Sequence, residues 1–197
     1  MKKIPTLFKR EYADHKVIGI TPELTDPSLQ IVLDGKATAT LKEDGSCCCI
    51  LGTDFYKRYD AKKGKKAPAG AIPCQPEPDE ITGHWPHWVR VDKNNPADKW
   101  FIEALRNYIK EDGHIINGTY EAIGPHFQGN PYNMDHDTLY RHGSVIIPDL
   151  DTSFEGIRKF LDHNKIEGIV FWYNLEPICK IKRSDFGFTW PVEEGGL

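Results

Sequence analysis

The chain has 197 residues, 39% of them hydrophobic, which suits one domain with a substantial core. No stretch approaches the roughly 20 apolar residues of a membrane-spanning helix, and a net charge of −4 disfavours a general nucleic-acid binder. The five cysteines, three of them consecutive, form neither a disulfide framework nor a C-x-x-C motif, so we expect a reducing, intracellular and cytoplasmic setting with no membrane partner.

Short strand patterns dominate the first part of the chain. "LQIVL" (29–33), "ATATL" (37–41) and "CCCIL" (47–51) are apolar or alternating, and K-x-D-G separates the last two. Because Gly45 tolerates turn geometry, we expect a tight strand–turn–strand with Lys42 at the end of the first strand. A solvated hairpin tip with its charges facing water is the alternative, and these four residues do not decide between the two.

A basic stretch and a loop-like stretch follow. Residues 56–66, "YKRYDAKKGKK", hold six Lys or Arg against one Asp, a pattern that favours phosphates, although a solvated basic loop is equally compatible. Residues 64–87 are rich in Gly, Pro and Lys, which is typical of a long surface loop or an insertion within a domain. We therefore expect a single domain over 1–197 with a loop or insertion at about 62–87.

Two helices are predicted in the second part. In the segment 97–113, Asp98 can cap an amphipathic helix that Gly113 ends, and in 151–164, Thr152 and Glu155 have capping-box spacing. Further strands are predicted at 88–91, 118–124, 144–147, 168–173 and 178–182. Many strands with two helices predict an α+β fold of mostly antiparallel sheets flanked by helices.

Charged residues interrupt several of these predicted strands. Glu121 lies within "NGTYEAIG" and Glu167 precedes "GIVFWY". Lys180 and Lys182 are two positions apart, so their side chains project from one face of a strand. Each charge could simply reach solvent from a strand end. Together with Lys42, however, two carboxylates and three lysines facing one cleft would suit a polyphosphate with magnesium ions.

The order of these motifs carries a family resemblance. Four patterns occur in the order K-x-D-G, an acid among strand formers, E-G-I-V and K-I-K. They resemble motifs I, III, IV and V of the covalent nucleotidyltransferases, which include ATP-dependent DNA and RNA ligases and capping enzymes. Longer stretches look like segments of the vertebrate-type 5′-to-3′ RNA ligase family. These stretches are "KEDGSCCCI", "GHWPHWVRVDKNN", "TYEAIGPHFQGNPY", "HGSVIIPDL" and "KIEGIVFW". The resemblance runs from about residue 36 to 186. It implies a nucleotidyltransferase (adenylation) domain, and we expect no OB-fold after it.

The resemblance implies an ATP-dependent RNA ligase. Lys42 matches the nucleophile that attacks the α-phosphate of ATP and becomes covalently linked to AMP. The AMP then passes to an RNA 5′-phosphate, and a 3′-hydroxyl displaces it to seal the strand. Lys180 and Lys182 match the lysines that hold the phosphates and assist catalysis. Glu167 matches the acid that ligates Mg²⁺ or Mn²⁺, and Glu121 matches an acid that contacts the ribose or helps to bind the metal.

The remaining nucleotide contacts are also implied by the resemblance. Asp44 and Gly45 complete motif I, where the glycine lets the nucleotide approach the backbone. Arg58 matches an arginine near the ribose or the α-phosphate. For the adenine, the backbone near Leu41 could read the exocyclic amine. The stacking residue could be Val145 or Ile147.

Other functions and partners remain open from the sequence. An enzyme of the same fold could stop after adenylating RNA ends, and a module without catalysis could bind nucleotide or RNA. A non-catalytic binder would not need a positioned nucleophile, which favours the ligase. The expected partner is RNA with 5′-phosphate and 3′-hydroxyl ends, gripped by the basic stretch, and the protein is expected to be a monomer.

Overall fold

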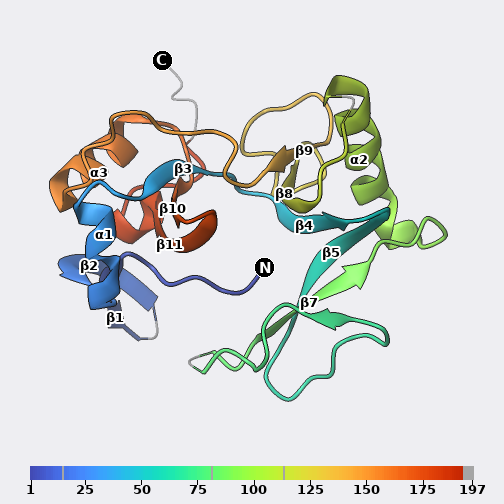
Figure 1. Cartoon of the computed structure of the whole chain (residues 1–197), viewed down its shortest axis with the longest axis horizontal. Helices are drawn as coiled ribbons and strands as arrows, with labels where there is room; N and C mark the ends of the chain where they lie inside the picture. The colour runs from blue at the N-terminus through green and yellow to red at the C-terminus, as the bar shows by residue number, and fades with distance from the viewer. Residues whose placement is uncertain (15, 81, 113, 193–197) are drawn as a thin grey trace. The chain divides into compact units, whose positions relative to one another are not determined.

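The computed structural model describes residues 1–14, 16–80, 82–112 and 114–192 (Figure 1). The strands within them pair in antiparallel fashion, so the expected α+β class with antiparallel sheets is confirmed. The chain forms two compact units from separated segments. Unit 1 comprises Met1–Lys3 and Asp44–His142, and unit 2 comprises Ile4–Glu43 and the chain from Gly143 onward. No described helix is long and apolar enough to cross a membrane.

Unit 1 is built on a six-stranded sheet in the order β6-β7-β5-β4-β8-β9. Its elements are β4 (Ser46–Leu51), β5 (Asp54–Ala61), β6 (Ile72–Pro73), β7 (Trp85–Arg90), the 3-10 turn η2 (Pro96–Asp98), α2 (Lys99–Asp112), β8 (Gly118–Ile123) and β9 (Thr138–Arg141). Helix α2 lies beside β8 and β9 (Figure 1). Its apolar side, with Phe101, Ala104, Leu105 and Tyr108, packs on a core that includes Tyr120. The predicted helical stripe therefore faces the sheet.

The start of α2 differs from the prediction. Asn95 caps the preceding turn η2 by accepting a hydrogen bond from the Ala97 backbone. Asp98 does not cap the helix, because its buried carboxylate instead accepts from the Asp92 backbone at 2.9 Å and contacts the Lys57 ammonium. The helix runs to Asp112, and the predicted terminator Gly113 lies outside the described residues.

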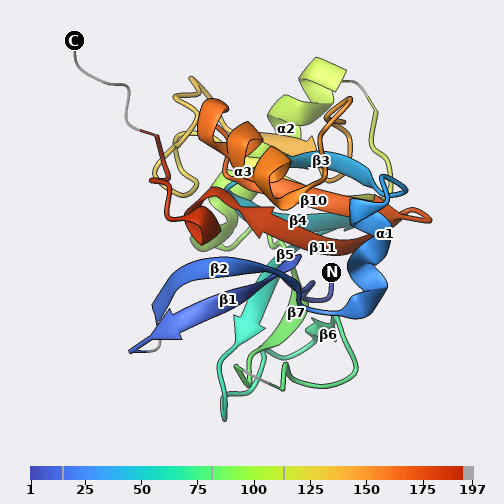
Figure 2. The same cartoon turned by 90° about the vertical axis from the view of Figure 1, so that its left-hand side faces the viewer.

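Unit 2 contains a three-stranded sheet in the order β11-β10-β3 and a two-stranded sheet, β1-β2 (Figure 2). Its elements are β1 (Phe8–Ala13), β2 (Lys16–Leu24), the 3-10 turn η1 (Pro27–Leu29), α1 (Gln30–Leu33), β3 (Thr38–Lys42), α3 (Phe154–His163), β10 (Gly168–Tyr173), β11 (Glu176–Lys182) and the 3-10 turn η3 (Arg183–Phe186). Residues 5–7 run along β11, where Leu7 N donates to Lys180 O at 2.8 Å. Lys180 N donates in turn to Pro5 O at 3.0 Å.

One face of the three-stranded sheet forms the core of unit 2. Alternate residues of the three strands are packed there with Ile157 and Leu161 of α3. These strand residues are Ala39, Leu41, Ile169, Phe171, Cys179 and Ile181. Because side chains alternate between the two faces of a strand, the intervening residues, among them Lys42, Lys180 and Lys182, belong to the opposite face.

Two predicted strands of unit 2 are wrong. Residues 30–33 form helix α1, since the Asp26 carboxylate accepts from the Ser28 backbone and Pro27 occupies the first helical position of η1, which together start helical turns. The segment 144–147 contributes only an isolated bridge from Ile146 to Thr40. The cap of α3 is Ser153, whose hydroxyl accepts from the Gly156 backbone, whereas the predicted cap Thr152 donates to Leu33 O.

The predicted strand–turn–strand around Lys42 is also wrong in part. Lys42 does end β3, but β3 pairs with β10 and β4 pairs with β5 and β8, so β3 and β4 lie in different sheets. Gly45 is required for a different reason. A Cβ atom there would lie 2.1 Å from the Ala122 carbonyl oxygen, so the close approach of β8 excludes any side chain. The sequence patterns also missed β1, β2, β5, β6 and β9.

Candidate active site

The register of unit 2 aligns the predicted lysines across one sheet face. Gly168 on the central strand β10 is opposite Lys42 on β3 and opposite Lys182 on β11. Directly opposite residues of antiparallel strands have their side chains on the same face of the sheet, so Lys42 and Lys182 share a face. Lys180 lies on that face too, because it is two residues before Lys182 on the same strand. A Cβ atom on Gly168 would lie 2.3 Å from the Ile181 carbonyl oxygen, so this position must lack a side chain. We call the surface formed by Lys42, Lys180 and Lys182 the lysine face.

Glu167 joins two of the lysines. It directly precedes β10, is only 3% exposed, and its two carboxylate oxygens contact the ammonium groups of Lys42 and Lys182. Burial of an ionised carboxylate is unfavourable unless it is paired, and both partners here are cations. The structure therefore brings together three residues that the sequence placed in motifs I, IV and V.

Lys180 has a different environment. Burial, reinforced by the neighbouring cations Lys42, Lys182 and Arg10, lowers the pKa of Lys180 to about 8. Among the described residues, no carboxylate lies within ion-pairing distance of its ammonium group. A half-buried cation beside other cations favours an anionic ligand, because such a ligand would relieve the repulsion.

Sequence reasoning missed Arg10 and Asp185. Arg10 of β1 contacts the Asp185 carboxylate through Nε at 2.8 Å and Nη2 at 2.7 Å. Asp185 is 2% exposed and also accepts from the Lys182 backbone at 2.8 Å, so it fixes both Arg10 and the end of β11. Asp185 follows "ICKIK" closely, which is a usable signal, whereas Arg10 lies outside the part of the chain that carried the family resemblance.

The residues predicted to hold adenine have mixed positions. The Leu41 backbone N–H already donates to Val145 O at 3.0 Å, and Leu41 packs against the core. Val145 is 39% exposed, while Ile147 is buried in the core and donates its N–H to Ala39 O. An aromatic side chain that the sequence reasoning overlooked, Trp172, donates its indole N–H to the Thr40 hydroxyl at 2.8 Å, on the side of β3 that carries Lys42.

Glu121 belongs to unit 1, where it has two close neighbours. It lies on β8 directly opposite Cys47 of β4, and its carboxylate is 2.8 Å from His142 Nε2. Burial, with the Glu121 charge as the next contribution, raises the pKa of the Cys47 thiol to about 12. The structure thus assigns Glu121 to a Cys–Glu–His cluster in unit 1, and Lys42, Glu167 and the two later lysines to unit 2.

The motif I residues Asp44 and Gly45 are held by the segment after β8. The Asp44 backbone N–H donates to the Tyr132 hydroxyl at 2.6 Å, and Gln128 donates to Gly45 O at 3.2 Å. Tyr132 closes the G-N-P-Y sequence, so this pattern was the available signal for the contact. Arg58 on β5 is paired with Asp60, with Nε 2.8 Å from the carboxylate.

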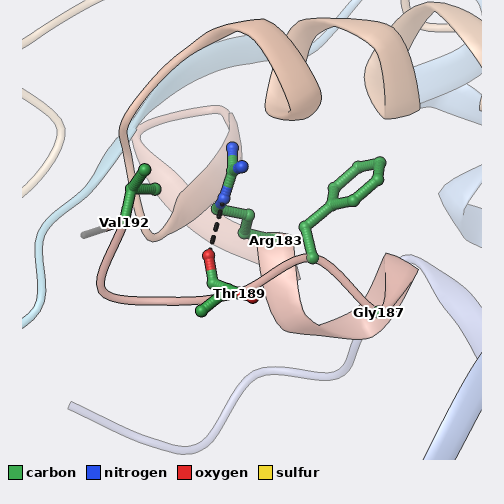
Figure 3. A pocket seen from close by; sticks show the side chains of 5 residues that line it. Arg183, Gly187, Thr189 and Val192 are labelled. Carbon is green, nitrogen blue, oxygen red and sulfur yellow. Dashed lines mark hydrogen bonds between the residues drawn. The ribbon is translucent and has the colours of Figure 1, made fainter. Parts of the chain in front are cut away.

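A pocket of ≈ 510 Å³ lies elsewhere in unit 2 (Figure 3). It is lined by Arg183, Gly187, Phe188, Thr189 and Val192. The Arg183 guanidinium donates to Thr189 O at 2.9 Å and to backbone carbonyls at the end of α3, including Asn164 O at 3.0 Å. These contacts give Arg183 a structural role as the cap of that helix.

Comparisons with known proteins agree with the resemblance to RNA ligases. No family model matches the chain. RNA ligase 1 of Rattus norvegicus is 26% identical over 276 aligned positions, which cover 98% of this chain and 83% of that protein. RNA ligase 1 of Pongo abelii is 25% identical with the same coverage, and that of Danio rerio is 27% identical over 60% of this chain and 45% of its own length. The chain is therefore similar to RNA ligases, at 25–27% identity.

The chain is shorter than these relatives over the shared region. The 276 aligned positions exceed the 197 residues of the chain, so the rat protein has segments without a counterpart here. Nevertheless, the comparison with the rat protein covers 98% of this chain.

Proposed function

We propose that this chain is an ATP-dependent RNA ligase with a nucleotidyltransferase fold, and that the lysine face binds the nucleotide phosphates. The observation that carries the proposal is the placement of Glu167 between Lys42 and Lys182, with Lys180 beside them and without an acidic partner among the described residues. The names of the relatives support an RNA ligase, and the cationic face supports a polyphosphate substrate.

In the proposed first step, Lys42 attacks the α-phosphorus of ATP. A P–N bond forms to Nζ, and the P–O bond to pyrophosphate breaks. The ammonium must leave its ion pair with Glu167 and lose a proton before the attack, and the nitrogen loses a second proton to solvent as the phosphoramidate forms. The position of Lys42 at the end of β3, fixed by its register with Gly168, restricts the approach of the amine.

The other cations act on the phosphates. Lys182 and Lys180 stabilise the charge that develops on the phosphorus and on the departing pyrophosphate. Arg10 is available for the same task, because Asp185 holds its guanidinium close enough for its charge to act on Lys180. Trp172 provides an aromatic surface on the same side of the sheet for the base or the ribose.

The carboxylates suit a Mg²⁺ or Mn²⁺ cofactor. Glu167 of unit 2 supplies the oxygen donors that these hard cations prefer, and Glu121 of unit 1 offers donors of the same kind. In this structure both oxygens of Glu167 contact ammonium groups, so a metal ion at Glu167 would compete with Lys42 and Lys182 for the same carboxylate. When bound, such an ion neutralises phosphate charge and assists the departure of pyrophosphate.

The later steps use RNA. The AMP passes from Lys42 to an oxygen of an RNA 5′-phosphate, which breaks the P–N bond and forms a pyrophosphate linkage, and the departing Nζ takes up a proton from solvent. The 3′-hydroxyl oxygen of the other strand then attacks the 5′-phosphorus, AMP leaves, and the hydroxyl proton goes to solvent. The RNA backbone needs cations that are not already paired, and the exposed lysines after β5 meet this requirement.

Self-labelling tests the first step. The purified protein is incubated with Mg²⁺ and ATP radiolabelled at the α-phosphate, and is then run on a denaturing gel. The unchanged chain should retain label, Lys42→Ala should lose it, and Lys36→Ala, an exposed lysine just before the same strand, should keep it. Label that persists in Lys42→Ala would exclude this residue as the nucleophile.

A nicked RNA with a 5′-phosphate tests the sealing step. A longer RNA product identifies a ligase. Accumulation of adenylated RNA without a longer product identifies an enzyme that stops after the second step. RNA or nucleotide binding without any labelling, in a folded protein, identifies a non-catalytic binding module.

A further inference from the structure

The Cys–Glu–His cluster of unit 1 is built on a rigid sheet. Cys47 and Glu121 are directly opposite residues of the paired strands β4 and β8. His142 follows β9, and its backbone N–H donates to Thr119 O of β8 at 3.0 Å. Backbone hydrogen bonds therefore fix the origins of all three side chains within one sheet.

The three side chains have the spacing of metal ligands. One ligand atom from each, the Cys47 sulfur, a Glu121 oxygen and a His142 nitrogen, all lie within 4.8 Å of one another. Ligands around a tetrahedral zinc ion, with bonds of about 2.0–2.3 Å, are about 3.5 Å apart. The Glu121 oxygen and the His142 Nε2 atom are 2.8 Å apart, so an ion bound between them would take the place of this direct contact.

The surroundings favour a bound cation. The side chains of Glu121 and His142 are 12% and 16% exposed, so their contact is largely shielded from solvent. The His142 Nδ1 atom is buried and has no hydrogen-bond partner in the part of the chain that the structure describes, and buried polar atoms are nearly always paired. Arg58 lies near Cys47, but its guanidinium is already paired with the Asp60 carboxylate, which offsets its repulsion of a metal ion.

We propose that Cys47, Glu121 and His142 bind a transition-metal ion of the Zn²⁺ class, with a fourth position left for solvent. A sulfur, a nitrogen and a carboxylate oxygen are the donor set of zinc, whereas Mg²⁺ prefers oxygen donors alone. The thiol loses its proton to the buffer when the sulfur binds the metal. This proposal shares Glu121 with the ligase proposal, but it also depends on Cys47 and His142, which the ligase proposal does not use, and its test measures metal binding and not ligase activity.

Cobalt(II) is the probe that tests the site. The metal-free protein is titrated with Co²⁺ while the ultraviolet–visible spectrum is recorded. We expect a thiolate-to-cobalt charge-transfer band that saturates at one ion per chain and that Zn²⁺, but not excess Mg²⁺, abolishes. Cys47→Ser should remove the band, and Cys74→Ser, a half-buried cysteine of the same unit, should retain it.

Further variants keep the result decisive if Cys47→Ser does not fold, as judged by circular dichroism. Glu121→Gln, which preserves the shape of the side chain, and His142→Ala should each weaken Co²⁺ binding by more than about tenfold. A folded protein that shows no charge-transfer band, or a band unchanged in these variants, would overturn the proposal.

Discussion

Lys180 shows how strongly the setting of a single residue can change its chemistry. Like Lys182, it comes from the K-I-K sequence and belongs to the lysine face, yet Lys182 has Glu167 as a partner and Lys180 has none among the described residues. Burial and the three neighbouring cations lower the pKa of Lys180 to about 8, so its charge is lost just above neutral pH. Among the lysines of this face, Lys180 is therefore the one whose charged form a bound phosphate would stabilise most.

This difference predicts a pH dependence of nucleotide binding. Below its pKa of about 8 Lys180 is charged and attracts phosphate, and above it the amine is neutral. Affinity for α,β-methylene ATP, which cannot transfer AMP, should therefore fall as the pH rises through this value, by at most about tenfold per pH unit. Isothermal titration calorimetry measures the effect. Lys180→Arg stays charged and should lose the slope, and an equal slope in both proteins would contradict the assignment.

The two motif glycines act at the level of strand packing. In K-x-D-G, Gly45 lets the backbone of β8 approach, and in E-G-I-V, Gly168 lets β11 approach. Neither glycine has a positive φ, so both are required by contact distance and not by turn geometry. These residues therefore bring the motif strands close to their partners, in addition to any contact with a nucleotide.

Gly45→Ala should be strongly destabilising. The new Cβ would lie 2.1 Å from a backbone oxygen of β8, which cannot move without breaking the sheet. We expect a loss of more than about 2 kcal/mol in the free energy of unfolding, measured by urea denaturation. Gly19→Ala is the matched control, because its nearest neighbour, Glu11 Oε2, would be 3.4 Å away and the change should be nearly neutral. Similar midpoints for the two variants would refute the packing argument.

At the scale of the whole molecule, the basic stretch 56–66 divides into two parts. Lys57 and Arg58 lie on β5 and are paired with Asp98 and Asp60. The lysines after β5 are exposed and have no ion-pair partner within the described residues. These are Lys62, Lys63, Lys65 and Lys66. The positive charge that RNA could use is therefore concentrated in the loop and not on the strand.

Replacing these four loop lysines by glutamine should separate RNA binding from nucleotide chemistry. We expect RNA sealing at moderate salt to slow by about tenfold or more. Its salt dependence should also become weaker, because fewer phosphate contacts release fewer counterions. Self-labelling with ATP should persist. The matched variant with four arginines keeps the charge and should seal RNA normally. Loss of labelling in a folded glutamine variant would show that the loop also serves the first step.

The sequence by itself determined the local features of this protein. The apolar stripes of α2 and α3, the strand over 168–173 and the alternation of K-I-K all depend on residues close together in the chain, whose periodicity is visible in the sequence. Helix α1 was missed although its signal, Asp26 followed by proline, was also local.

Only the tertiary structure decided which strands pair and which side chains meet. Every residue type except proline offers the same backbone hydrogen-bonding groups, so the sequence did not show that β3 joins β10 and not β4. The contact of Arg10 with Asp185 spans 175 positions, and Cys47, Glu121 and His142 come from three separate segments. Such contacts follow from the register of the sheets, because register places residues that are distant in the chain directly opposite one another.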